Sequence, residues 1–122
     1  MIFKKELIPL ILNGKKTQTR RLVKNDKPRW KVGNTYAVQD GRGRPAICRI
    51  KILSIKKEKL LDIDEKDAKR EGCYNRVSFL YTFYYLNKLV KNYIHLIGHP
   101  DSFAGKKWNP DVWILDFELV KK

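Results

Sequence analysis

The chain changes from a helical to an extended pattern at Gly14-Lys15-Lys16-Thr17-Gln18-Thr19-Arg20-Arg21. Asn13-Gly14 is typical of a helix end, and Thr17–Val23 has the pattern of a strand. Because a packed core needs no such density of cations and hydroxyl groups, we expect this stretch to bind an anionic or strongly polar ligand. The preceding helix is predicted from apolar residues at helical spacing, namely Phe3, Leu7, Leu10 and Ile11.

Outward from this stretch, the pattern predicts short strands and a few helices. Pro9 indicates either a first helical turn or a kink, and the shift of apolar phase at Leu53 and Ile55 predicts a bulge or a strong twist. We therefore expect one α+β domain over residues 1–122, whose antiparallel strands close into a small β-barrel with flanking helices. The other expected elements are strands at Thr35–Gln39, 46–52 and Trp113–Leu119, and helices at Asp64–Gly72 and Arg76–Ile97.

The net charge of the chain favours a polyanionic partner. Lysine and arginine outnumber aspartate and glutamate by 27 to 13, which gives a net charge of +14 on 122 residues. Such a charge destabilises a small domain by self-repulsion, and nucleic acid is the commonest partner that requires it. A high-salt environment and heat tolerance are the alternative explanations.

The cysteines and the apolar runs bear on the cellular compartment. Cys48 and Cys73 have no metal-type spacing, so we interpret both as reduced thiols of a cytoplasmic protein. The N-terminal residues lack the order of a signal peptide, and the longest uncharged run, Val77–Asn87, is too short to cross a bilayer. No membrane association is expected.

The pattern Gly14-x-Lys16-x-x-Thr19-x-Arg21 resembles the signature of ASCH domains, which belong to the PUA-like superfamily of small β-barrels. Three further segments resemble the family in the same order along the chain, namely Lys31–Val38, Asp67–Gly72 and Asn109-Pro110 followed by Val112–Leu119. The resemblance implies a barrel with a cleft beside the signature and a function related to RNA. It implies no cofactor.

One bacterial branch of this family hydrolyses acetylcytidine, and the resemblance carries its catalytic residues onto Lys16, Thr19 and Glu71. The threonine hydroxyl needs an adjacent base, and a lysine can be that base only if burial or nearby cations lower its pKa. Positions 16 and 19 would lie on opposite faces of a regular strand, so a turn or bulge must intervene. The structural alternative is that Lys16 and Arg21 contact phosphates, Thr19 occupies a strand position and Glu71 forms a salt bridge.

Nucleic-acid binding is the interpretation that the basic residues favour. Such a patch attracts phosphates without reading sequence, and aromatic rings beside it stack on unpaired bases. For Tyr36 a core position is favoured over stacking; for Trp108 both remain open. The predicted nucleic-acid-binding residues are Lys15, Lys16, Arg20, Arg21, Lys24, Arg29, Trp30, Arg42, Arg44 and Trp108.

We therefore favour a domain that binds RNA or other single-stranded nucleic acid in a basic cleft formed by Gly14–Arg21 and Glu71. Whether it is an enzyme stays open: the alternatives are an amidohydrolase acting on acetylated cytidine nucleosides and a ribonuclease. His95 and His99 have helical spacing, but no third ligand is evident, so no metal is expected. Aromatic residues crowd the start of the long helix and leave a homodimer open, at Tyr81, Phe83, Tyr84 and Tyr85.

Overall fold

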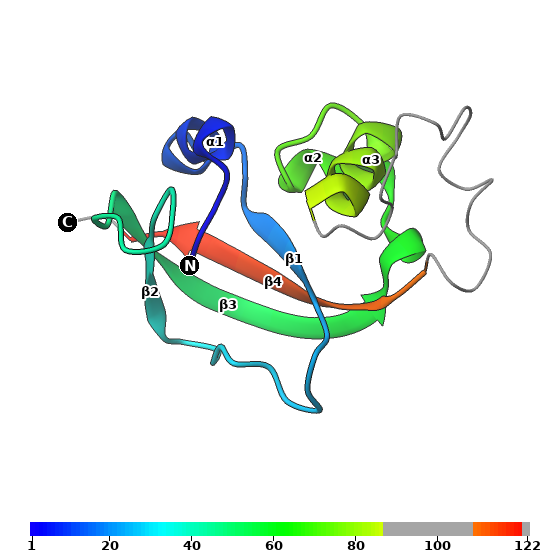
Figure 1. Cartoon of the computed structure of the whole chain (residues 1–122), viewed down its shortest axis with the longest axis horizontal. Helices are drawn as coiled ribbons and strands as arrows, with labels where there is room; N and C mark the ends of the chain where they lie inside the picture. The colour runs from blue at the N-terminus through cyan, green and yellow to red at the C-terminus, as the bar shows by residue number, and fades with distance from the viewer. Residues whose placement is uncertain (87–108, 121–122) are drawn as a thin grey trace.

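The computed structural model describes residues 1–86 and 109–120, and its centre is a four-stranded antiparallel sheet (Figure 1). The strands are β1 (Gln18–Leu22), β2 (Thr35–Val38), β3 (Cys48–Lys59) and β4 (Asp111–Leu119), in the spatial order β1-β4-β3-β2. The helical elements are η1 (Lys5–Leu7), α1 (Ile8–Leu12), η2 (Leu60–Asp62), α2 (Glu65–Arg70) and α3 (Arg76–Leu86).

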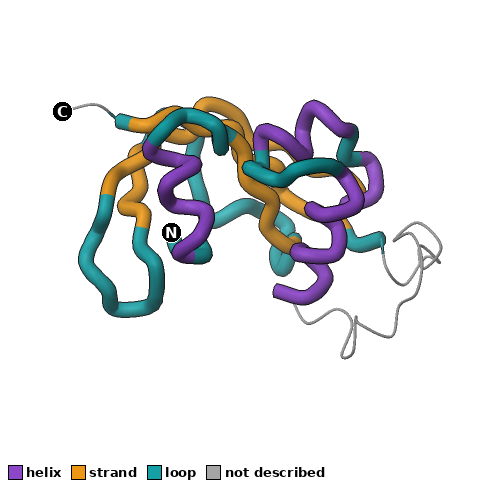
Figure 2. Tube along the Cα trace, turned by 90° about the horizontal axis from the view of Figure 1, so that it is seen from above, coloured by secondary structure: helices purple, strands orange, loops and turns teal. Residues whose placement is uncertain are grey.

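The three α-helices cover one side of the curved sheet, and the long connection from β1 to β2 runs along the other side in Figure 1. Figure 2 shows α1 near one end of the sheet and α2 with α3 near the other end. The stretch from Gly14 to Arg21 joins these regions, because it leaves α1 and enters β1. No helix in the described part of the chain is long and apolar enough to span a membrane.

Strand β4 is the central element of the core, since its side chains are buried on both faces. Val112 and Ile114 pack with the α2 and α3 side chains, whereas Leu115 and Phe117 pack with Phe3 and α1. The register of β3 against β4 shifts between Ile52 and Ser54, as the apolar phase predicted.

The structure bears on two expectations about the N-terminal half. The edge strands β1 and β2 do not pair with each other in the described structure, so a closed barrel is not shown. Residues 1–3 instead lie along the end of β2, where Phe3 N donates to Gln39 O at 3.0 Å and Gln39 N donates to Met1 O at 2.9 Å. The first helix begins as the 3-10 turn η1, and Pro9 occupies the first turn of α1, where a missing N–H costs nothing.

The later helices follow the predicted pattern only in part. Helix α2 begins after Asp64, whose carboxylate accepts a hydrogen bond from Asp67 N at 2.8 Å. Helix α3 is described as far as Leu86, so the rest of the expected Arg76–Ile97 helix, with His95 and His99, lies outside the described residues. Phe83 and Tyr84 are buried in the core of the chain itself, so they do not form the exposed aromatic patch that we considered for a homodimer.

Candidate functional site

The turn between α1 and β1 places Lys16 before the strand. Lys16 N donates to Leu10 O at 2.9 Å and Thr17 N donates to Arg70 O at 2.8 Å, and β1 starts only at Gln18. The alternation of a regular strand therefore does not by itself decide how Lys16 lies relative to Thr19.

Lys16 and Glu71 form a buried ion pair. The Nζ ammonium of Lys16 donates to Glu71 Oε1 at 3.0 Å, to Glu71 O at 2.7 Å and to Gln18 O at 2.8 Å, which occupies all three of its N–H groups. Both side chains are at most 4% exposed. Burial lowers the pKa of Lys16, although the Glu71 carboxylate opposes this shift.

Arg20 binds the other oxygen of the same carboxylate. Its guanidinium donates to Glu71 Oε2 at 3.0 Å, to Asp67 Oδ2 at 3.3 Å and to the side-chain oxygen of Gln18, and it lies over the ring of Phe79. The Gln18 amide donates in turn to Asp116 Oδ1 at 2.7 Å. Lys16 and Arg20 are therefore engaged inside the protein and do not present their charges to solvent.

Thr19 lies on the other face of β1. Side chains alternate along a strand, so Gln18 and Arg20 face the α2 side while Thr19 and Arg21 face away from it. Thr19 is 2% exposed, and the three N–H groups of Lys16 are directed at other oxygens. Of the three candidate catalytic residues, the structure thus joins Lys16 to Glu71 and leaves Thr19 outside the hydrogen-bond network.

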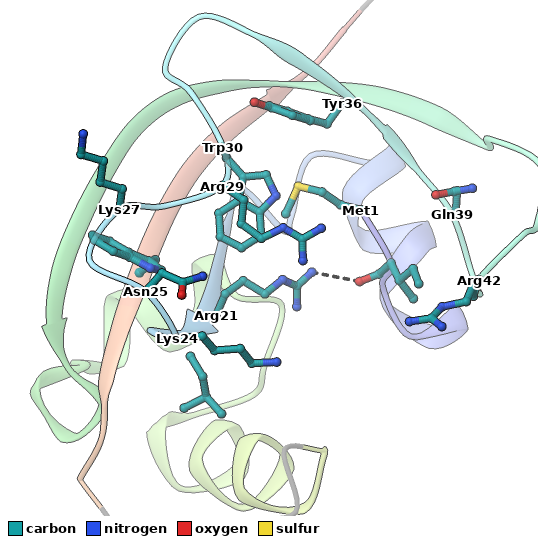
Figure 3. Close-up of a pocket in the computed structure, with 13 residues that line it drawn as sticks. Met1, Arg21, Lys24, Asn25, Lys27, Arg29, Trp30, Tyr36, Gln39 and Arg42 are labelled. Atoms are coloured by element: carbon teal, nitrogen blue, oxygen red, sulfur yellow. Dashed lines mark hydrogen bonds between the residues drawn. The ribbon is translucent and has the colours of Figure 1, made fainter.

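A pocket of about 620 Å³ lies between β1, β2 and their connection, and we call it the basic pocket (Figure 3). Five of its side chains are cationic, and among the described residues no aspartate or glutamate lines it. Figure 3 shows the guanidinium groups of Arg21 and Arg29 side by side. The lining residues are Met1, Ile2, Arg21, Leu22, Lys24, Asn25, Lys27, Arg29, Trp30, Tyr36, Gln39, Arg42 and Trp113.

Arg21 is held in place at the centre of this pocket. Its guanidinium donates to Ile2 O at 2.9 Å and lies 4.9 Å from the centre of the Phe3 ring. Partial burial lowers the pKa of Arg21; Glu71 opposes this shift, and the nearby Arg29 adds to it. An arginine remains charged at neutral pH despite such shifts, so the pocket keeps a strong positive potential.

Three aromatic rings accompany the cations. Trp30 lies under the guanidinium of Arg29 at 5.6 Å, and the Tyr36 hydroxyl accepts a hydrogen bond from Lys31 N at 2.8 Å. Trp113 stands opposite Arg21 in the register of β1 and β4, and it also contacts Lys57 of β3, whose Nζ lies 5.8 Å from the ring centre. Cations therefore flank the Trp113 ring on both neighbouring strands.

The structure separates the ten residues predicted to bind nucleic acid. Half of them meet in the basic pocket, namely Arg21, Lys24, Arg29, Trp30 and Arg42. Lys16 and Arg20 are buried, Lys15 lines a different pocket, and Arg44 pairs with Asp40 at 3.1 Å. Trp108 lies outside the described residues.

The alternating strand predicted a core position for Trp113, which its burial confirms, but it did not show that Trp113 also lines the basic pocket. The register with Arg21 could not be read from either strand alone. Gln39 and Asn25 gave no signal at all. Among the described residues, no group of three histidine, cysteine or acidic side chains is placed to hold a metal ion.

Comparisons with known proteins agree with this architecture. A family model described as ASCH domain matches residues 1–85. A solved ASCH domain from Lactobacillus crispatus JV V101 is 20% identical with a TM-score of 0.61, over 91% of this chain and 68% of that one.

Two further solved structures share the fold. Protein EF3133 from Enterococcus faecalis V583, of family model DUF984, is 19% identical with a TM-score of 0.63, over 94% of this chain and 70% of that one. The hypothetical protein PH0355 is 16% identical with a TM-score of 0.60, over 97% of this chain and 94% of that one. No curated protein matches the chain.

Proposed function

Because the chain belongs to the ASCH domain family, we propose that it binds single-stranded RNA through the basic pocket. The observation that carries this proposal is the convergence of five cationic side chains on one recess that no acidic side chain of the described residues lines. Cations held close together without compensation repel one another, and an anion in the recess relieves that repulsion.

The mixture of groups in the pocket favours RNA over a simple inorganic anion. Arginine forks bind phosphate oxygens in pairs, and the half-buried rings of Trp30 and Tyr36 offer surfaces for unpaired bases, whereas Trp113 is buried. A pocket of about 620 Å³ is of the size that takes a small organic ligand, so it admits an unstacked nucleotide but no duplex. The expected contact is one or two nucleotides of a single strand.

A second candidate function is hydrolysis at Lys16, Thr19 and Glu71, with acetylated cytidine as the substrate that the family resemblance suggests. One observation favours it: Lys16 is buried against Glu71, and its pKa is lowered, as a general base requires. In this mechanism a neutral Lys16 takes the proton of the Thr19 hydroxyl, whose oxygen attacks the acetyl carbonyl. The protonated Lys16 returns that proton to the leaving amine of cytidine as the C–N bond breaks, and water then hydrolyses the acetyl-threonine to release acetate. Lys16 must first exchange one of its three hydrogen bonds for the threonine.

A paired assay separates these functions. Wild type, Arg29→Ala and Lys16→Ala are each incubated with labelled single-stranded RNA and with acetylcytidine, and binding, strand cleavage and deacetylation are measured. We expect RNA binding that Arg29→Ala weakens about tenfold, the loss of one charge-assisted contact, while Lys16→Ala retains it.

The other outcomes are equally informative. Deacetylation that disappears in Lys16→Ala would assign the hydrolytic function, and strand cleavage without deacetylation would assign a ribonuclease. Equal RNA affinity of wild type and Arg29→Ala would reject the basic pocket as the binding site. Lys4→Ala, an exposed lysine outside this pocket, is the matched control for loss of one charge.

A further inference from the structure

A second pocket, of about 570 Å³, lies between the end of α1 and the turn that follows α2; we call it the tyrosine pocket. Tyr74 is 87% exposed, more than any other large apolar side chain in the described part of the molecule. An aromatic ring exposed to that degree contributes almost nothing to the core and is accessible to a ligand. The lining residues are Leu10, Lys15, Glu65, Lys69, Gly72, Cys73 and Tyr74.

The backbone on both sides of Tyr74 is fixed. Before it, Gly72 N donates to Lys69 O at 2.9 Å and Cys73 N donates to Ala68 O at 3.0 Å. After it, the start of α3 is capped reciprocally, because Ser78 N donates to Asn75 Oδ1 at 2.8 Å and Asn75 N donates to Ser78 Oγ at 3.2 Å. The ring is therefore presented to solvent from a rigid turn between two helices.

Two lysines stand beside the ring. Neither Lys15 nor Lys69 forms an ion pair within residues 1–86 and 109–120, and Lys15 is positioned by its own N–H, which donates to Asn13 Oδ1 at 3.0 Å. The acidic residue of the pocket, Glu65, directs both carboxylate oxygens to Arg76 N at 3.3 Å. The pocket thus combines an exposed ring, two available ammonium groups and an apolar wall from Leu10.

Cysteine chemistry does not explain this pocket. Burial raises the pKa of the Cys73 thiol, and Lys16 opposes this only in part. The thiol is therefore held in its unreactive protonated form at neutral pH.

The stretch Gly14–Arg21 connects this pocket to the basic pocket. Lys15 lines the tyrosine pocket, Arg21 lines the basic pocket, and Lys16, which lies between these residues in the sequence, forms the buried pair with Glu71. We propose that the tyrosine pocket is a second nucleotide subsite, in which Tyr74 stacks on an unpaired base while Lys15 and Lys69 bind the adjoining phosphates of the same RNA strand. This inference rests on the proposed RNA-binding function.

Length-dependent binding tests the second subsite. Fluorescence anisotropy is measured with labelled oligouridines of 3, 6, 9 and 12 nucleotides for wild type, Tyr74→Ala and Tyr74→Phe. The shortest oligomer should bind wild type and Tyr74→Ala equally, since the basic pocket alone holds it. With 12 nucleotides, Tyr74→Ala should bind about fivefold or more weakly, the loss of one base–aromatic stack, whereas Tyr74→Phe should match wild type.

A charge-matched pair of variants tests the phosphate contacts. Lys69→Ala should weaken binding of the 12-nucleotide RNA about threefold, which corresponds to one weak ionic contact. Lys66→Ala, which removes the same charge from the same helix outside the pocket, should match wild type. Crosslinking of 4-thiouridine RNA, read by mass spectrometry, should label the peptide that contains Tyr74.

Each contrary result has a definite meaning. Wild-type affinity of Tyr74→Ala for the longest RNA, without crosslinking at Tyr74, would overturn the subsite and leave the basic pocket standing. If Tyr74→Ala weakens binding equally for RNAs of every length, the proposal that one RNA strand occupies both pockets is wrong. If wild type binds no RNA of any length, the proposed RNA-binding function fails together with the subsite.

Discussion

At the scale of single residues, the Glu71 carboxylate is shared between two buried cations. Oε1 accepts a hydrogen bond from Lys16 and Oε2 accepts one from Arg20, both at 3.0 Å. Arg20 also pairs with Asp67, but Lys16 has Glu71 as its acidic partner, and the desolvation of Lys16 is not completely offset. The outcome is a lysine that releases its proton more readily than an exposed lysine, whether or not the chain is an enzyme.

The replacement Lys16→Met tests this balance through the pH dependence of stability. At neutral pH we expect it to lower the free energy of unfolding by about 1–3 kcal/mol, because Glu71 keeps its pair with Arg20 while the buried carbonyl oxygens of Gln18 and Glu71 lose their donor. The lowered pKa of folded Lys16 lies below the unfolded value of about 10.4, so the unfolded chain binds more protons between these two values. Wild type should therefore gain stability relative to Lys16→Met as the pH rises through this interval.

Urea unfolding of both proteins between pH 7 and pH 10 measures the difference. Both proteins carry Cys73→Ala, because Lys16 influences the pKa of that thiol, and comparing them cancels the titration of Cys48, whose pKa is raised by burial in both. If the difference in unfolding free energy between wild type and Lys16→Met narrows as the pH rises, the ion pair with Glu71 raises the pKa of Lys16 more than burial lowers it. Lys16 would then be unsuited to act as a base.

At the scale of elements, the turn after α2 fixes the distance between that helix and the Lys16 turn. Gly72 has a φ of +90°, and a Cβ added to it would lie 3.0 Å from Leu10 Cδ1 and 3.4 Å from Lys16 Cβ. Gly33 has nearly the same φ, +88°, but an added Cβ would meet nothing within 4 Å. Alanine substitutions at Gly72 and at Gly33 therefore separate the cost of the backbone conformation from the cost of close packing.

We expect Gly33→Ala to lower the free energy of unfolding by about 1–2 kcal/mol, the cost of a left-handed conformation for a residue with a Cβ. Gly72→Ala should lower it by about 1 kcal/mol more, because Leu10 and Lys16 must also move. Chemical denaturation of both variants gives the comparison. Equal losses would show that Leu10 moves aside freely and that the turn does not restrain Lys16.

The elements differ in how far the sequence predicted them. Asp64, Gly72 and the phase shift at Leu53 are local signals, and the helix and bulge they predicted are confirmed. Closure of the barrel depends on contacts between β1 and β2, which no local pattern encodes. The contact of Glu71 with Lys16 is likewise a long-range pairing, and the alternation along β1 could not say which of Arg20 and Arg21 faces the helices.

At the scale of the whole molecule, the question is whether the net charge of +14 acts as a diffuse field or through the basic pocket. A diffuse field attracts RNA from every direction, so each lysine or arginine contributes alike. A pocket concentrates contacts on a few phosphates, and each of these releases a counterion from the RNA. The dependence of affinity on salt therefore distinguishes the two cases.

The logarithm of the RNA association constant should fall linearly with the logarithm of salt concentration, by roughly 0.7 for each phosphate contacted on a single strand. Arg29→Ala should make this slope shallower by roughly 0.7, since one phosphate contact is lost. Trp30→Ala should weaken binding at every salt concentration without changing the slope, because stacking releases no counterion. Lys51 is an exposed lysine of β3 outside the basic pocket, so Lys51→Ala is the matched control. It should leave both the RNA affinity and the salt slope unchanged. If Lys51→Ala and Arg29→Ala change the slope equally, the charge acts as a diffuse field, and the basic pocket is no more than one part of it.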